Sequence, residues 1–485
     1  MLWHITKREI YDHFTSLRFA LTIGLITLLM ALNALIFVSS DYKQRLLEYS
    51  QNIAWVADKV RASCQHLNEL ATQGPVGFYK RPSPLAFCAN DQEDALPIRI
   101  QAQGGLGSNS WGGPPERSYR YRPPWKLEYR QDNYQKNSML QTFTALDWSF
   151  IIGVVMSFIA ILFTFDAISG ERERGTLALT LSNSVPRGVI LLAKFLGAFI
   201  VIAVPMLMGM LLSLLIVTLS GVVSLSGNDW ARIGLMAVLS FIYISMFIGL
   251  GLAISSHIAH SSTSLLVLLL IWVVLVVLVP NTLGSVVSTL RKVPSQREFQ
   301  QHRESMMQPF WNITKDEIFK YGSPTQPNPN IKAIEWWANY ITTRWGTEAR
   351  LDDEHLDAQF AQVQFARKIL RASPTTIYNY AMETLAGTGF ERHRQFVKAV
   401  RRYRSQFIEF IKAADRADPE SFHVYYLKEG LSSKPVNFED VPRFVEPTGV
   451  GVAAKDALMD LSLLLLFSAL LFLVSYVAFL RCDVW

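Results

Sequence analysis

The chain has little charge, and it lacks the short motifs that mark common catalytic sites. Charged residues make up 18% of its 485 residues and hydrophobic residues 50%. It contains no phosphate-binding loop, no GxSxG elbow and no HExxH motif, and the glycine-rich residues 104–107 are not followed by lysine. We therefore predict no catalytic residue, no metal site and no cofactor on this chain. Its composition is that of a membrane protein.

Six apolar runs approach or exceed the length of about 20 residues that a helix needs to cross a bilayer. They are residues 19–39, 147–168, 189–219, 232–254, 262–281 and 457–480. The first run follows a basic leader, but its apolar core is too long for a signal peptide and no clear cleavage site comes after it. We therefore predict an all-α polytopic membrane protein with six transmembrane helices, the first of them retained.

Short basic segments set the expected orientation. They are the leader 1–18, which should form an amphipathic lead-in helix, the loop 169–188 and the tail 481–485. Short basic loops remain in the cytoplasm, so both termini should lie there. Two large extracytoplasmic inserts, 40–146 and 282–456, then lie outside. Turn residues in the first insert predict a mixed, loop-rich structure, whereas apolar residues at helical spacing predict that the second insert is mainly helical.

Only three cysteines occur, and two of them fall in the first insert. Cys64 and Cys88 lie in that insert, and Cys482 lies at the cytoplasmic end. A disulfide between Cys64 and Cys88 would suit an oxidising compartment such as a bacterial periplasm. The alternative is two unpaired cysteines acting as small apolar side chains. A periplasmic disulfide and cytoplasmic termini together predict a multi-pass protein of the bacterial cytoplasmic (inner) membrane.

Basic residues alternate with aromatic residues near the end of the first insert. The basic ones are Arg117, Arg120, Arg122, Lys126 and Arg130. Outside the membrane they could contact lipid headgroups, an anionic cargo or an acidic partner. The alternative is a solvated face close to the bilayer, with aromatic rings packed beneath it. The net charge of +6 needs no nucleic-acid partner, because inner loops of membrane proteins carry excess Lys and Arg.

A charged loop between the second and third apolar runs is the most informative segment. Its candidate functional residues are Asp166, Glu171, Arg172, Glu173, Arg174, Gly175 and Thr176. Consecutive charges beside a span are costly unless they lie at the water boundary and meet a partner there. The segment therefore predicts a short coupling helix on which a soluble motor docks, and the alternative is a hydrated loop. We expect Gly175 to allow a tight turn and Thr176 to cap the segment after it.

This prediction includes an expectation about exposure. We expect the carboxylates of Glu171 and Glu173 to be exposed when the soluble partner is absent. Replacing both with alanine should then leave folding largely intact.

A second inner turn joins the fourth and fifth runs. It contains Ser255, His257 and His260. The two histidines could share one helical face, but no third ligand type is nearby. We therefore expect this turn to carry helix caps rather than a metal ion.

The charged segment, the second inner turn and part of the second insert resemble those of a known family. Asp166–Leu177, with Leu181-Ser182 and Pro186-Arg187 after it, resembles the first coupling helix of permease subunits of type 2 ATP-binding-cassette (ABC) exporters. The group includes permeases of nitrous-oxide reductase maturation and of gliding-motility transporters. Residues 255–280 also match. Ser373-Pro374, residues 385–389 and Arg392-His393 resemble a subgroup with a large external domain before the last span.

The resemblance implies a transporter subunit that works with other chains. It implies two copies of an ABC ATPase subunit that bind ATP and Mg, and a second permease, either the same chain or a related one. The chain would then be a permease in the lipid bilayer, an exporter by family and not itself an enzyme. One alternative is an ABC-coupled mechanotransmitter that acts on a periplasmic partner without moving cargo. Another is a membrane receptor or scaffold without an ATPase.

Overall fold

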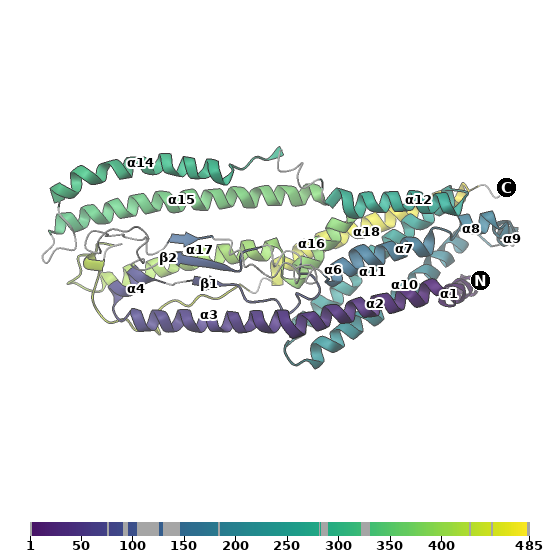
Figure 1. Ribbon diagram of the computed structural model, residues 1–485, viewed down its shortest axis with the longest axis horizontal. Helices are drawn as coiled ribbons and strands as arrows, with labels where there is room; N and C mark the ends of the chain where they lie inside the picture. The colour runs from purple at the N-terminus through teal and green to yellow at the C-terminus, as the bar shows by residue number, and fades with distance from the viewer. Residues whose placement is uncertain are drawn as a thin grey trace.

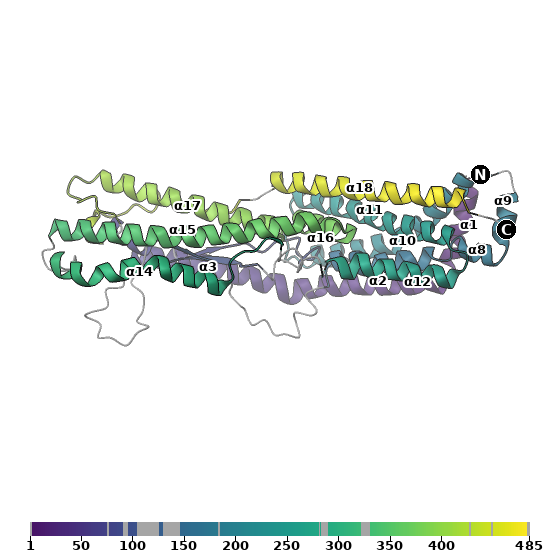
Figure 2. The same ribbon diagram turned by 90° about the horizontal axis from the view of Figure 1, so that it is seen from above.

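The computed structural model is an elongated helical molecule with two regions arranged end to end (Figure 1). The residues it describes are 2–74, 77–90, 96–103, 126–129, 146–182, 185–280, 282, 290–321, 330–425, 428–447 and 450–482. One region is a bundle of long apolar helices, and the other projects from the end of the bundle opposite the chain termini (Figures 1 and 2). The predicted helical membrane protein is thus confirmed.

Six helices in the described part of the chain are long and apolar enough to cross a membrane, as predicted. They span Leu17–Ser63, Trp148–Glu173, Arg187–Leu219, Gly227–His257, Ser261–Leu278 and Ala457–Leu480. Their elements are α2 (Leu17–Ile36), η1 (Phe37–Asp41), α3 (Tyr42–Ser63), α6 (Trp148–Phe150), η3 (Ile151–Met156), α7 (Ser157–Thr164), α8 (Ser169–Glu173), α10 (Arg187–Leu219), α11 (Gly227–His257), α12 (Ser261–Trp272), η4 (Val273–Leu278) and α18 (Val450–Leu480). The π-helical turn η1 joins α2 to α3, so the first span continues as one long helix into the projecting region.

The first insert combines helices with a small antiparallel sheet. Its elements are α3, α4 (Leu67–Gln73), β1 (Gly77–Tyr79), β2 (Arg99–Gln103) and β3 (Lys126–Glu128). The strand order is β1-β2-β3, with Phe78 opposite Ile100 and Ala102 opposite Leu127. Lys126 begins β3, whereas Arg117, Arg120, Arg122 and Arg130 lie outside the described residues.

The second insert is helical. Its elements are α14 (Gln296–Tyr321), α15 (Ile331–Leu370), α16 (Pro374–Ala386), α17 (Phe390–Arg416) and the short η5 (Lys428–Gly430). On α17, buried apolar residues recur at helical spacing from Phe396 through Val400 to Phe407, which gives the helix one apolar face. That face joins Leu70 of α4 and Phe78 of β1 in a distal core. The two inserts therefore share one core.

The predicted disulfide between Cys64 and Cys88 is wrong. No bridge joins the two residues, although the structure describes both. Cys64 lies in the distal core, whereas Cys88 lies in the core of the membrane bundle. The chain segment between them leads from one region to the other. Closeness in sequence therefore does not bring their thiols together.

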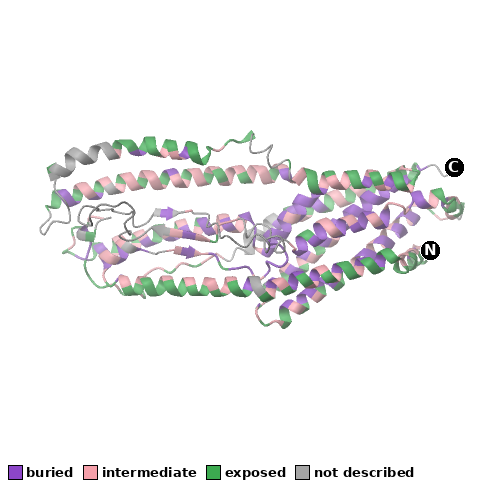
Figure 3. Cartoon of the chain, viewed as in Figure 1, coloured by how far each residue is buried: buried purple, intermediate pink, exposed green. Residues whose placement is uncertain are grey.

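Helix α16 is the element of the second insert that enters the bundle. Almost all of its residues are buried, and it packs against α11 and α18. The hydroxyl of Thr375 lies 3.0 Å from that of Tyr243, and the hydroxyl of Tyr378 lies 3.0 Å from that of Ser240. Figure 3 shows buried residues concentrated in the bundle, whereas much of α3 is exposed. Helix α16 thus joins the projecting region to the end of the spans opposite the chain termini.

Candidate functional site

The predicted coupling segment lies at the end of the bundle where both chain termini lie (Figure 1). It forms two short helices, α8 and α9 (Thr176–Ser182). Gly175 separates them with φ at +71°, in the left-handed region that only glycine adopts without strain. The turn at Gly175 therefore separates α9 from α8.

A buried lysine holds α8 against the third span. Lys194 of α10 has a side chain that is 3% exposed, and its Nζ lies 2.7 Å from Oε1 of Glu171 and 2.9 Å from Oε1 of Glu9. Two carboxylates thus neutralise one buried cation. The second carboxylate oxygen of Glu171, Oε2, is buried and accepts no hydrogen bond from a described residue.

The lead-in helix α1 (Leu2–Phe14) supplies Glu9 to this ion pair. It packs against α10 at Gly197, where an added Cβ would lie 2.8 Å from Cβ of Glu9. Glycine at this position therefore lets the two helices approach closely enough for Glu9 to reach Lys194.

The coupling segment and the second inner turn cap each other's helices. Oγ of Ser255 accepts hydrogen bonds from the backbone N–H groups of Ile168 and Ser169, at 3.0 and 3.1 Å. Glu173 in turn accepts from the backbone N–H of Ser261 at 3.0 Å and from its hydroxyl at 2.5 Å. Each cap satisfies N–H groups that a helix start leaves without an internal partner.

The histidines of the second turn take different positions. His260 precedes α12, and its Nδ1 lies 3.4 Å from Oε1 of Glu173. His257 ends α11 and is exposed. Among the described residues, no group of three or more His, Cys, Asp or Glu is arranged to hold a metal ion.

Two arginines join further spans to this site. Arg18 at the start of α2 pairs with Asp166 at 3.2 Å and donates to the carbonyl of Leu162. Arg187 at the start of α10 donates to the carbonyl of Leu480, at the end of α18, at 2.8 Å. At the end of the bundle where the termini lie, the spans are thus connected through short polar contacts.

One expectation about the coupling residues is wrong. Glu171 is not freely exposed, because it is half-buried and bound by Lys194 within the chain. Glu173 is exposed as expected, yet it is not free, because Ser261 binds it. The Thr176 hydroxyl donates to the carbonyl of Glu171 in α8 at 3.2 Å, which ties the start of α9 to α8.

The surface left for a partner lies around the turn between α8 and α9. Arg172 is half-buried and Arg174 is exposed. On α9, Leu179 is 70% exposed although it is apolar, whereas Leu177 is buried. A basic residue at the end of α8 and an apolar residue on α9 thus both face solvent.

The sequence predictions missed Glu9, Arg18, Lys194 and Ser261. For Lys194 a signal exists, because it is a lone charge within a long apolar run, and ionisable residues within spans usually have a function and a partner. For Glu9, Arg18 and Ser261, the local sequence does not indicate which side chain each one contacts. Their importance depends on how helices far apart in sequence pack.

Comparison with known proteins gives two kinds of match. The family model described as ABC-2 family transporter protein matches residues 3–484. Proteins named "Probable ABC transporter permease protein NosY" from Pseudomonas aeruginosa and Stutzerimonas stutzeri are each 47% identical over 55 residues. That stretch is 11% of this chain, and it covers 20% of each relative's length.

Proposed function

Because the chain belongs to the ABC-2 family of transporter proteins and is an ABC transporter permease subunit, we propose that α8 and α9 receive the ATPase and pass its movement to the spans. One observation carries the proposal. Helix α8 is bound by side chains of three other helices, α10, α11 and α12, while Arg174 and Leu179 beside it remain exposed. A partner that moves α8 must therefore move the helices bound to it.

The contacts at α8 can distribute a displacement among several spans. Glu171 connects α8 to α10 and, through Lys194, to α1, whereas Glu173 connects it to α12. Ser255 connects it to α11. Rigid helices linked in this way transmit a small shift as a rigid-body movement rather than absorbing it. The unpartnered Oε2 of Glu171 offers an acceptor to a donor that approaches when α8 moves.

The same helices can carry the movement outward. The first span continues through η1 into α3, and α11 contacts α16 through Tyr243, whose ring stacks on that of Tyr378 at 4.4 Å. Arg371, just before α16, pairs with Asp460 of α18 at 2.6 Å. A tilt of these spans would therefore displace the projecting region as well.

Co-purification with the ATPase tests the docking surface. We expect the double variant Arg174→Glu/Leu179→Asp to lose most of the bound ATPase. The reversed charge at residue 174, and a carboxylate at residue 179 that docking would bury in the interface, both oppose binding. The matched control is Arg350→Glu, which reverses an exposed charge on α15. Normal ATPase recovery with the double variant, or equal loss with the control, would refute docking at this surface.

We propose that the working complex is an exporter in the bacterial inner membrane. It contains two permeases and two ATPase subunits that bind ATP and Mg, with both chain termini in the cytoplasm. The spans support a second permease, because only 17% of the most apolar stretch of Ser261–Leu278 is buried within the chain, against 61% for Gly227–His257. Loss of the ATPase during purification of the wild-type chain would instead favour a receptor or scaffold.

A second candidate function is mechanical work on a periplasmic partner. Burial of α16 in the outer end of the bundle favours it, because this helix ties the projecting region to several spans. ATP-driven movement of the projecting region without cargo crossing a proteoliposome membrane would support this function. Cargo crossing that depends on ATP would support the exporter.

A further inference from the structure

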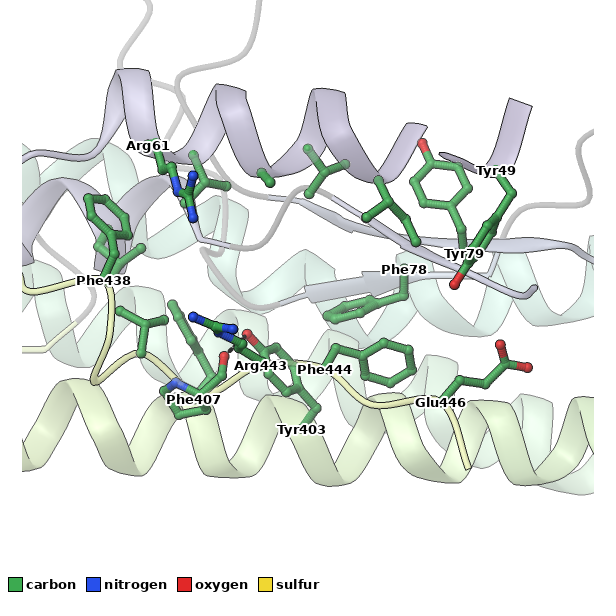
Figure 4. A pocket seen from close by; sticks show the side chains of 18 residues that line it. Tyr49, Arg61, Phe78, Tyr79, Tyr403, Phe407, Phe438, Arg443, Phe444 and Glu446 are labelled. Atoms are coloured by element: carbon green, nitrogen blue, oxygen red, sulfur yellow. Dashed lines mark hydrogen bonds between the residues drawn. The ribbon is translucent and has the colours of Figure 1, made fainter. Parts of the chain in front are cut away.

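A cavity of about 420 Å³ lies in the projecting region, far from the coupling site. Its walls are α3, β1, α17 and the segment 438–446 (Figure 4). Apolar side chains from three of these walls line it, among them Val56, and Figure 4 shows Phe78 and Phe444 near its middle. The volume falls within the range of pockets that bind small molecules, which is about 300–1,000 Å³.

Aromatic rings make one wall of this cavity rigid. The ring of Phe78 packs edge-to-face against Phe444 at 5.0 Å and against Tyr403 at 5.3 Å. The Tyr403 hydroxyl also donates to the carbonyl of Pro442 at 2.8 Å, which holds the segment 438–446 against α17. These contacts hold one wall of the cavity in place.

The charges of the lining are unequal at its two ends. Arg61 and Arg443 lie toward one end, while Glu446 lies toward the other with Tyr49 and Tyr79 (Figure 4). Glu446 is already bound by Nη2 of Arg392 at 3.0 Å and by the backbone N–H of Arg81 at 2.9 Å. Neither Arg61 nor Arg443 pairs with a carboxylate of the described residues.

We propose that this pocket binds a single-chain anionic amphiphile, a molecule with an aliphatic chain and one carboxylate. The chain would occupy the apolar middle, and the carboxylate would accept hydrogen bonds from the guanidinium groups of Arg61 and Arg443. Guanidinium groups bind carboxylates in a planar, two-point geometry, which suits this role.

The position of the pocket shows from which side such a molecule arrives. Tyr49 is the first residue of α3 that lines it and lies 13 residues beyond Ile36, so the pocket begins about 20 Å past the end of α2 at 1.5 Å per residue. Because α2 alone is long enough for the hydrocarbon layer, the chain of a lipid still in the bilayer cannot reach the pocket. The occupant is thus a free amphiphile from the aqueous phase, and its binding does not depend on the direction of transport.

Binding of dansyl-undecanoic acid to the full chain in nanodiscs tests the proposal. We expect a saturable signal above that of empty nanodiscs, displaced by dodecanoic acid. Methyl dodecanoate should displace it about tenfold less well, because it cannot form the charged hydrogen bonds. Absence of saturable binding, or equal displacement by the acid and the ester, would overturn the proposal.

Two pairs of variants assign the signal to this pocket. Ala57 is exposed and lines the pocket, so Ala57→Trp should block binding, whereas Ala54→Trp on the same helix should not. The double variant Arg61→Gln/Arg443→Gln should weaken binding of the acid about tenfold and leave the ester unchanged. The control Arg402→Gln/Arg416→Gln removes two exposed charges of α17 outside the pocket. Wild-type binding by either pocket variant would contradict the assignment.

Discussion

At the residue scale, the ion pair of Lys194 decides how the coupling segment is held. A lysine with a side chain 3% exposed is unstable without partners, and Glu9 and Glu171 both contact it. Because one cation lies between two carboxylates, each charge depends on the other two. A substitution at Glu171 therefore changes the anchoring of α8 as well as its surface.

The first prediction concerns this ion pair. We expect Glu171→Gln to lower the free energy of unfolding by about 2 kcal/mol, because it leaves a buried cation with one carboxylate. The triple variant Glu9→Gln/Glu171→Gln/Lys194→Met should recover much of that loss, since it removes all three charges. Thermal unfolding of the purified chain measures both, with Arg172→Gln as the control. An unchanged midpoint for Glu171→Gln would show that the pair contributes nothing.

A second residue, His393 of α17, makes the projecting region sensitive to acid. Its side chain is buried, its ring lies against Phe360, and its Nδ1 has no hydrogen-bond partner among the described residues. Burial, and then the charge of Lys80, lower the pKa of His393 to about 3. The native structure therefore holds this histidine neutral.

The second prediction comes from the sign of this shift. Below its ordinary pKa of about 6.5 the unfolded chain binds a proton that the folded chain does not, so stability falls as the pH falls toward 3. This histidine should make the free energy of unfolding about 2 kcal/mol lower at pH 5 than at pH 8. Unfolding of His393→Leu, measured at both values, should show a smaller loss than the wild type. Equal losses in the two proteins would contradict the assignment to His393.

At the element scale, α8 depends on its neighbours for its structure. It has five residues, whereas an isolated helix shorter than about 12 residues is marginal in water. Ser255 caps its start from α11, and Glu173 at its end caps α12. The two inner turns therefore form one unit, and loss of either cap should loosen both.

The third prediction tests this unit. Ser255→Ala leaves two backbone N–H groups without their acceptor and should cost about 1–2 kcal/mol. We expect reduced ATP hydrolysis by the complex with its ATPase, because a loosened α8 transmits less. The control is Ser256→Ala, whose hydroxyl donates to Ala253 within α11. Activity equal to that of the control would show that the cap plays no part in coupling.

At the scale of the whole molecule, the two functional ends are separated by the length of the spans. The termini and the coupling segment lie at one end, and the inserts project from the other (Figures 1 and 2). This arrangement is the one that an even number of spans produces. With the ATPase docked on α8 and α9, as we propose, the inserts face the opposite compartment.

The fourth prediction concerns that orientation. In a chain whose own cysteines are replaced, a cysteine at residue 350 should react with a membrane-impermeant maleimide applied from the periplasmic side. A cysteine at residue 174 should react only after the inner membrane is opened. Labelling of residue 174 from the periplasmic side, with residue 350 labelled only after the membrane is opened, would show the opposite orientation.

The fifth prediction concerns the second permease. The resemblance to type 2 ABC permeases implies that the first and fifth spans form the contact. A cysteine at Leu270 of α12, which is 64% exposed, should therefore crosslink with a permease partner. A cysteine at Leu211 of α10, which is 63% exposed, is the control and should not. The crosslinked fraction is measured by gel electrophoresis. Crosslinking at Leu211 alone would place the contact on another face.

Much of the architecture could be predicted from sequence because it depends on local properties. Apolar runs of sufficient length form spans wherever they occur, so the six helices can be predicted from hydropathy. The charged run at 166–177 can be predicted to lie at the water boundary, because charges are costly inside a bilayer. The spacing of apolar residues on α17 predicts its buried face. These features depend on neighbours within a few turns of the chain.

Only the tertiary structure decided which distant groups meet. Glu171 is bound because α10 brings Lys194 beside it, and Ser255 caps α8 because two inner turns lie together. Likewise α16 enters the bundle, and Cys64 and Cys88 lie in different cores. The physical reason is that each contact depends on the packing of helices far apart in sequence, which the local pattern of either partner does not encode.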